Sequence, residues 1–403
     1  MISPRSLTAR CGVSDYAAAL LSHLRSSGIN ADHLSPDEHG VKDFIRRLRF
    51  FAPDIIHLQY HRDDFETSHW PAVMSLLSGI TTIPLITTFH DLPWPSREYR
   101  AGIAGFSDRL LLCFSAKVLF TNRYDLGEAA RRYPVIGEKA DLAPVGPGRE
   151  CILPEAFDRR LVRRQLGFND GEIILLYFGF LKPGKGVETL IESIRLLLKR
   201  GHRVKLLIVG DLHTEAGTGE MSYAESIRRS CEDETLTGQI TVIGYLKPDE
   251  ISAVLKAGDI GVLPFDEGLS SKRSSFFTLI QHGIPTVSTR GAKSRDTLVE
   301  AAAAFLVPSR DPSALASHLE RMITDQTLID RIMPRLAIYM RDHHSWPAIV
   351  QFQMVLYRNL LKKVSADGNI GINDRSLNEL CRILPAGKGT VCDEGPGCRM
   401  RKA

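Results

Sequence analysis

Short apolar segments alternate with amphipathic ones over most of the chain, from about residue 11 to residue 363. The pattern is clearest in the second half, where residues 173–179 and 204–210 are almost entirely apolar. Residues 187–198, between them, place apolar side chains on one helical face, and Gly201 follows where such a helix commonly ends. Apolar strands separated by helices predict a parallel sheet that is covered on both faces.

The first half of the chain repeats this alternation. Its first predicted helix has Ser14 as N-cap and Gly28 at its end, with apolar residues three or four positions apart between them. The strands expected in the two halves are residues 54–59, 84–88, 117–121, 142–145, 173–179, 204–210, 240–243, 260–264 and 285–288. The alternation in both halves predicts an α/β protein with two Rossmann-like, doubly wound domains. Because glycine and proline cluster at 146–154, we place these domains at 1–148 and 149–345.

The end of the chain has a different composition. A last helix is expected at residues 346–363. Residues 364–403 are rich in glycine, proline, asparagine and charge, and they have no apolar periodicity. This composition is typical of a disordered tail.

Overall composition excludes several classes of protein. The chain has 403 residues, with 51 Lys and Arg against 47 Asp and Glu, so its net charge of +4 gives no reason to expect nucleic acid. Its apolar runs are far shorter than the roughly 20 residues that cross a bilayer, and residues 1–10 do not form a secretory leader. Its seven cysteines lack CxxC spacing, which indicates a reducing compartment and no zinc site. A cytoplasmic protein is therefore expected.

Several segments of the chain follow one another in a familiar order. They read CGVSDYAAALLSHLRSSG, PDIIHLQYH, LITTFHD, VLFTN, ILLYFGFLKPGKGVETLIESIRLLLKRG, KLLIVGD, ITVIGYLKPDEISAVLKAGDIGVLPF and HGIPTVST. Together they resemble glycosyltransferase family 4, whose retaining enzymes have two Rossmann-like domains facing across a cleft (the GT-B architecture). The resemblance implies a UDP- or GDP-sugar donor, a sugar or lipid-linked acceptor, and no metal or other cofactor. It also implies that helix 346–363 crosses back onto the N-terminal domain.

The same resemblance implies roles for particular residues. Lys185, in a turn between a strand and a helix, corresponds to the lysine that stabilises the leaving diphosphate. His90, at a strand end, corresponds to a histidine that contacts the transferred sugar. The residues expected to bind the donor also include Gly12, Gly179, Gly244, Tyr245 and Leu246. A glycine beside a helix N-terminus, such as Gly12, allows a ligand to approach the backbone closely.

The chain departs from the family where charge is expected. Ser270 and Thr278 stand where relatives carry paired glutamates, and Phe180 stands where they carry an arginine. Lys272 and Arg273 could supply the missing positive charge, although a solvated basic loop would explain them as well. The helix after them is expected at residues 276–282, with Ser274 or Ser275 as its N-cap, which would aim backbone amides at an anion.

Other interpretations fit the same residues. Asp266 and Glu267 could substitute for the missing glutamates, although surface turns are often acidic. Without those glutamates, the chain could also be a non-catalytic partner subunit, or an epimerase of the same architecture. The arginines at 46, 47, 49, 131 and 132 could face an anionic membrane peripherally, but solvated helix faces explain them as well. His57 and His61 are expected to be structural.

Overall fold

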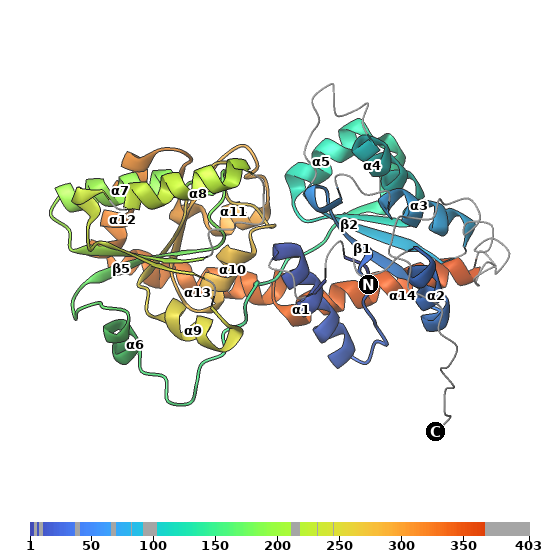
Figure 1. Ribbon diagram of the computed structural model, residues 1–403, viewed down its shortest axis with the longest axis horizontal. Coiled ribbons are helices and arrows are strands. Elements are labelled where there is room, and N and C mark those ends of the chain that lie inside the picture. Colours follow the sequence, from blue (N-terminus) through green and yellow to red (C-terminus); the bar gives the residue numbers. More distant parts are fainter. Residues whose placement is uncertain are drawn as a thin grey trace, which may run out of the picture.

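The computed structural model shows two α/β lobes side by side, with a long helical stretch running beneath both (Figure 1). The described residues are 1–3, 6–7, 11–36, 41–65, 70–81, 83–91, 103–210, 218–231, 233–244 and 246–366. The tail predicted at 364–403 therefore lies outside them from residue 367 onward.

The N-terminal lobe is built on a parallel sheet whose strands lie side by side in chain order. The strands are β1 (Ile56–His61), β2 (Leu85–Asp91), β3 (Lys117–Phe120) and β4 (Ala140–Leu142). β4 begins and ends earlier than predicted, and with three residues it is too short for an apolar run to mark its bounds. Beside β1, Ile2 at the start of the chain forms two isolated parallel bridges, one to Leu34 and one to Leu58.

Helices cover both faces of this sheet. In Figure 1, α3, α4 and α5 lie on one face, and α1 and α14 lie on the other. The helices are α1 (Gly12–Ser26), α2 (Val41–Phe51), α3 (Trp70–Ile80), α4 (Ile103–Phe114), α5 (Arg123–Arg132) and α14 (Trp346–Ala366). The predicted N-cap Ser14 was wrong. Cys11 caps α1, and its sulfur accepts a hydrogen bond from the Ser14 amide at 3.4 Å.

The C-terminal lobe has a doubly wound parallel sheet with the strand order β10-β9-β8-β5-β6-β7. Its strands are β5 (Ile173–Phe178), β6 (Val204–Val209), β7 (Ile240–Ile243), β8 (Ile260–Leu263), β9 (Thr286–Arg290) and β10 (Leu306–Pro308). The short edge strand β10 was not predicted, since three residues are too few to show a period. The order reverses between β5 and β8, and ligands bind such sheets at the carboxyl ends of the strands at this point.

Eight helices of the described residues accompany this second sheet. They are α6 (Arg159–Gln165), α7 (Val187–Lys199), α8 (Thr218–Cys231), α9 (Pro248–Lys256), α10 (Ser274–Gln281), α11 (Thr297–Ala301), α12 (Pro312–Thr324) and α13 (Gln326–His343). α7 is buried along the predicted apolar face, and Gly201 just beyond it has a φ of +84°, as its place after the helix requires. This fold confirms two Rossmann-like domains of the GT-B type.

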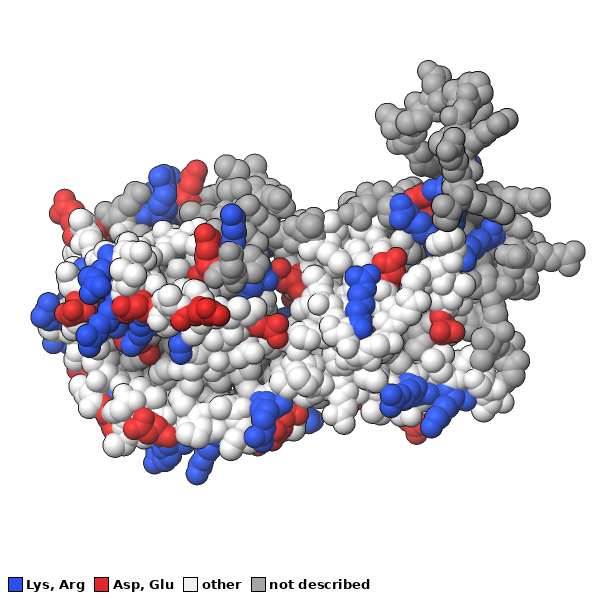
Figure 2. Space-filling model, turned by 90° about the horizontal axis from the view of Figure 1, so that it is seen from below, with Lys and Arg blue, Asp and Glu red and all other residues white. Residues whose placement is uncertain are grey.

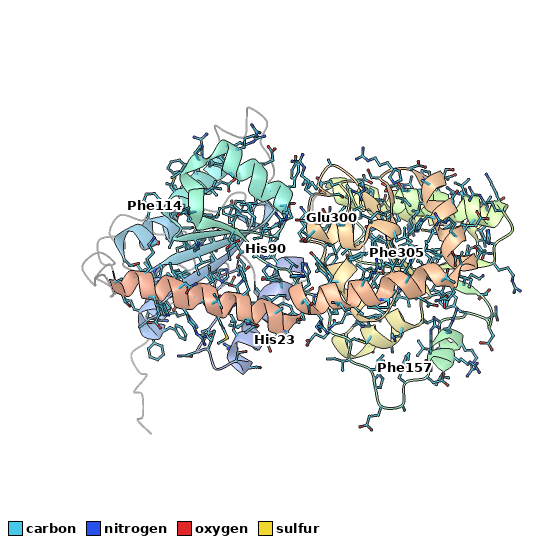
Figure 3. All side chains as sticks on the ribbon, turned by 180° about the vertical axis from the view of Figure 1, so that it is seen from behind. His23, His90, Phe114, Phe157, Glu300 and Phe305 are labelled. Atoms are coloured by element: carbon cyan, nitrogen blue, oxygen red, sulfur yellow. The ribbon has the colours of Figure 1, made fainter. Side chains whose placement is uncertain are left out.

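The last helix ties the two lobes together. Figure 3, seen from behind, shows α13 under one lobe continuing into α14 under the other. Trp346 packs against Tyr16 of α1, and Leu356 lies in an apolar cluster with Ile86 and Leu119 of the N-terminal sheet. α14 extends to Ala366, three residues beyond its predicted end. Within the described part of the chain, no helix is both long and apolar enough to span a membrane.

A buried carboxylate links the lobes at the cleft. Asp296 of the C-terminal domain accepts hydrogen bonds from the Arg123 amide at 2.7 Å and from the Ser271 amide at 2.8 Å. Arg123 begins α5 of the N-terminal domain, whereas Ser271 belongs to the loop before α10. One side chain therefore fixes the spacing between two loops on opposite sides of the cleft.

Replacing Asp296 by alanine is expected to loosen this contact. The change leaves two amides without their acceptor, at a cost of about 1–3 kcal/mol each where water does not reach them. We expect a lower melting temperature and a larger radius of gyration by small-angle scattering. Asp311→Ala, which removes a cap of α12 within one domain, should lower stability without changing the overall shape. An unchanged radius of gyration in Asp296→Ala would contradict this role.

Candidate active site

A cavity of about 370 Å³ lies between the two domains, at the carboxyl ends of both sheets. Most of the residues predicted to bind substrate line it: Gly12, His90, Gly179, Lys185, Gly244, Leu246, Lys272, Arg273 and Ser274. Ser270 and Thr278 are not among its lining residues, and Tyr245 lies outside the described residues. The domains thus bring together residues more than 170 positions apart, such as His90 and Lys272.

Close packing of two loops positions Lys185 at the rim of this cavity. Gly186 has a φ of +70°, and a Cβ on it would lie 1.9 Å from the carbonyl oxygen of Pro264. The Asp266 amide also donates to the Gly184 carbonyl at 3.1 Å. Only glycine fits at position 186, because the turn after β5 presses against the loop after β8. Lys185 is therefore held beside the residues that follow β8.

Lys185, Lys272 and Arg273 form a cationic cluster at this point. The Arg273 guanidinium lies 4.4 Å from the centre of the Phe265 ring, and the Lys185 Nζ lies 5.5 Å from the same centre. Burial, reinforced by the neighbouring Arg273 and Lys272, lowers the pKa of Lys185 to about 7. Cations held together against their mutual repulsion favour a bound anion that neutralises them.

Carboxylates of the protein neutralise only part of this cluster. Lys272 pairs with Asp91 at 3.1 Å across the cleft, and Arg273 lies 3.4 Å from Glu267. Although burial opposes it, Lys272 together with Lys293 lowers the pKa of Asp91. No described carboxylate lies within ion-pair distance of the Lys185 Nζ, so this charge faces the cavity without a fixed partner.

The helix after the cluster begins earlier than predicted. α10 starts at Ser274 and its N-cap is Arg273, with no capping side chain, so neither Ser274 nor Ser275 is the predicted cap. The Ser274 amide donates to the Lys272 carbonyl and the Phe276 amide to that of Arg273, both within hydrogen-bond distance. The start of α10, with both serines, lines the cavity beside the cations. A helix N-terminus in this position adds to the attraction for an anion.

The residues that replace the paired glutamates face the protein. Ser270 is fully buried, and its Oγ has no partner among the described residues. The Thr278 hydroxyl accepts from the Gly148 amide at 3.0 Å and donates to the Ser274 carbonyl at 3.0 Å. Thr278 thereby joins α10 to the connection between the domains. Their predicted contacts with donor remain predictions.

Asp266 and Glu267 do not take over that position. Asp266 pairs with Arg310 at 3.1 Å, and Glu267 pairs with Lys293 at 2.8 Å and also approaches Arg273. Neither carboxylate lines the cavity. Glu267 instead forms an ion pair with Arg273, which does line the cavity.

His90 approaches the cavity from the N-terminal domain. Figure 3 shows it at the end of the sheet nearest the other lobe. Its ring lies edge-on to Tyr16 of α1 with 5.1 Å between ring centres, and its Nε2 is 2.8 Å from Gln59 Oε1. Burial lowers the pKa of His90 to about 3, so the imidazole is neutral at physiological pH. A neutral histidine offers one donor and one acceptor nitrogen.

Some cavity residues escaped the sequence analysis. Asp64 follows β1 and Asp91 is the last residue of β2, and the rule that ligands bind at strand ends would have pointed to both. Arg149, which pairs with Asp15 at 3.0 Å, lies in the irregular connection between domains and gave no periodic signal. These residues add both signs of charge to the lining of the cavity.

Charge elsewhere on the surface is mixed. On the face drawn in Figure 2, Lys and Arg are interspersed with Asp and Glu, in keeping with the small net charge. Arg46 and Arg47 pair with Asp43 of their own helix, and Arg131 and Arg132 pair with Glu128 of theirs. These basic residues are therefore partly neutralised locally.

Comparison with known proteins agrees with this geometry. The family of glycosyl transferases group 1 matches residues 158–335, which include β5 to β10 and the cationic cluster. A D-inositol 3-phosphate glycosyltransferase of Corynebacterium efficiens is 26% identical over 340 residues, covering 79% of this chain and 74% of the relative. The capsular polysaccharide biosynthesis glycosyltransferase CapM of Staphylococcus aureus is 26% identical over 160 residues, covering 40% of this chain and 39% of CapM.

Solved structures show the same architecture over nearly the whole chain. Sucrose-phosphate synthase from Thermosynechococcus elongatus superposes with a TM-score of 0.71 at 17% identity, covering 90% of this chain and 99% of the synthase. Anabaena HepE in complex with UDP and glucose superposes with a TM-score of 0.70 at 16% identity, covering 89% of this chain and 98% of HepE. Residues 158–335 thus match the group 1 glycosyl transferases, and the whole chain shares its GT-B architecture with solved glycosyltransferases.

Proposed function

We propose that the protein transfers a sugar from a nucleoside-diphosphate sugar to an acceptor hydroxyl, with retention of anomeric configuration and without a metal ion. The observation that carries the proposal is the cationic cluster, which lies with the start of α10 at the point where the strand order of the C-terminal sheet reverses. A diphosphate fits this position because it is a compact anion that pairs with several cations at once. UDP is the first nucleotide to test, since HepE binds UDP and UDP-glucose.

In this mechanism the protein mainly positions the reactants and stabilises charge. Negative charge grows on the diphosphate as the bond to the sugar breaks, and Lys185, Lys272 and Arg273 lie where they would stabilise it. A phosphate oxygen takes the proton of the attacking hydroxyl, as the family resemblance implies. The N-terminal domain holds the acceptor near His90, so that both reactants meet in the cavity.

The acceptor is proposed to be a sugar or polyol, free or lipid-linked. Several relatives are named D-inositol 3-phosphate glycosyltransferases, which makes inositol phosphate a suitable first acceptor. We place the protein in the cytoplasm. The local ion pairs of Arg46, Arg47, Arg131 and Arg132 favour solvated helix faces over peripheral contact with a membrane.

A combined binding and transfer experiment tests this function. Melting temperatures are measured with UDP, GDP and their sugars, in the presence and absence of EDTA, because a selective ligand stabilises the folded protein. The selected donor is then incubated with a panel of acceptors, and the anomeric configuration of the product is determined by NMR. Transfer that survives EDTA and retains configuration is expected.

Other outcomes would replace the proposal. Binding of the donor without transfer to any acceptor would favour the non-catalytic partner subunit, which the buried Ser270 and Thr278 suggest. A donor sugar changed in configuration, without transfer, would favour the epimerase. Activity lost with EDTA and restored by a divalent ion would refute the metal-free mechanism.

Nucleotide affinity is expected to depend on pH through Lys185. Its pKa of about 7 in the free protein should rise when a diphosphate is bound, because the anion stabilises the ammonium. Above pH 7 binding must therefore take up a proton, and the Kd for UDP should rise by up to about tenfold per pH unit. Calorimetry between pH 7 and pH 9, in two buffers of different ionisation enthalpy, measures both effects. A Kd that stays constant over this range, with no proton uptake, would contradict the assignment.

A further inference from the structure

A continuous hydrogen-bond chain runs from the cavity into the N-terminal domain. The His90 Nε2 lies 2.8 Å from Gln59 Oε1, and the Gln59 Nε2 lies 3.1 Å from His57 Nε2. His57 Nδ1 lies 2.7 Å from the hydroxyl of Tyr357, which belongs to α14. Gln59 and His57 lie on β1 with one residue between them, so their side chains share one face of the sheet.

The Gln59 amide, with its oxygen toward His90 and its nitrogen toward His57, sets the direction of these hydrogen bonds. An amide nitrogen only donates, so His57 Nε2 accepts from Gln59, and also from the Thr88 hydroxyl at 2.8 Å. Burial lowers the pKa of His57 to about 3, so its ring is neutral and carries its one proton on Nδ1, toward Tyr357. At the other end the Gln59 carbonyl oxygen only accepts, so His90 carries its proton on Nε2.

From this arrangement we propose that Gln59 is a positioning residue that fixes the tautomer of His90 and leaves Nδ1 as a hydrogen-bond acceptor for a sugar hydroxyl. The inference rests on the proposed function, because the sugar is the expected occupant of the cavity. A histidine with the opposite tautomer would present a donor to the same hydroxyl. Gln59 does not line the cavity, so it acts only through His90.

The Gln59 amide lies inside the N-terminal domain. Gln59 is fully buried, and His57 is anchored at its far side by Thr88 and Tyr357. His57 and Tyr357, at the end of the hydrogen-bond chain away from His90, line a second cavity of about 790 Å³. This cavity is separate from the interdomain cleft. Tyr357 of α14 is therefore connected, through His57 and Gln59, to the His90 side chain in the cleft.

Charged groups near His90 do not determine which nitrogen carries the proton. The titratable groups that act on it are His61, Asp64, Asp91 and Lys272, with effects of both signs. None of them has a hydrogen bond to a ring nitrogen of His90 among the described residues, and the Gln59 carbonyl does. The tautomer therefore depends on this contact.

The tautomer is measured directly by ¹⁵N NMR of histidine-labelled protein without nucleotide. Wild type is expected to show His90 protonated at Nε2. Gln59→Leu should give a mixture of tautomers, whereas Gln59→Glu should keep the wild-type form, since a carboxyl oxygen still accepts from Nε2. Gln353→Leu is the matched control, because Gln353 is an equally buried glutamine with no hydrogen-bond partner among the described residues. In the Gln353→Leu variant, His90 should have the same tautomer as in wild type.

Kinetics decide whether the tautomer matters for transfer. Gln59→Leu should lower kcat/KM by about tenfold, the smaller of the losses known when the partner that orients a metal-bound histidine is removed. Gln59→Glu should recover most of the rate. A His90 protonated at Nδ1 in wild type, or a Gln59→Leu variant with an unchanged tautomer or rate, would overturn the proposal. A wild type that binds UDP-glucose without transfer would refute the proposed function instead, and the NMR result would remain independent of it.

Discussion

Lys185→Ala is expected to slow sugar transfer by about 10²- to 10³-fold, the usual loss when one preorganised group that stabilises a transition state is removed. Lys185 lies in the cleft with no described carboxylate at ion-pair distance, so its charge is available to the diphosphate. Negative charge on the leaving group is greatest in the transition state, so kcat should fall far more than the affinity for donor. Single-turnover transfer, together with calorimetric binding of UDP, separates the two effects.

Lys205→Ala is a suitable control for this measurement. Lys205 belongs to the same domain but pairs with Glu172 at 3.6 Å, away from the cleft. It should leave transfer and UDP binding unchanged. Equal transfer rates for wild type and Lys185→Ala would refute the mechanism as proposed, even if the variant bound UDP less tightly.

The sequence was most informative where side chains face one common environment. Strands such as β5 and β6 are buried on both faces, so their apolar runs mark them clearly. β10 and β4 are only three residues long, and so short a segment leaves its bounds to tertiary contacts. Helix starts were less predictable, because Cys11 and Arg273 hold N-cap positions that serine usually takes.

In the candidate site too, some features could be predicted from the sequence and others could not. Lys185 follows β5 and His90 lies near the end of β2, and both reach the cavity from the edge where ligands bind. Contacts between distant segments, such as that of Asp91 with Lys272, depend on how the domains meet. Neither periodicity nor spacing records that arrangement. For the same reason the burial of Ser270 and Thr278 became visible only in three dimensions.

Variants of Arg273 and Phe180 test whether Arg273 supplies the positive charge that is missing at position 180. Phe180 lines the cavity where family members carry an arginine, and Arg273 lies in the same cavity on the loop after β8. If Arg273 supplies that charge, Arg273→Ala should lower kcat by about tenfold to a hundredfold, less than Lys185→Ala, because Glu267 already shares its charge. The double variant Phe180→Arg/Arg273→Ala should recover much of this loss, since an arginine at 180 would again reach the diphosphate.

The single variant Phe180→Arg completes a double-mutant cycle, in which neighbouring residues with one shared partner are expected not to be additive. Glu267 keeps Lys293 as a partner at 2.8 Å when Arg273 is removed, so the loop should remain folded, and melting curves check this. Single-turnover rates for the four proteins then give the coupling between the two positions. Losses that simply add, with no recovery in the double variant, would show that Arg273 does not replace the missing arginine. Recovery would show instead that the diphosphate needs a second cation beside Lys185. This cation could then come from either position in the sequence, as long as its side chain reaches the same side of the cleft.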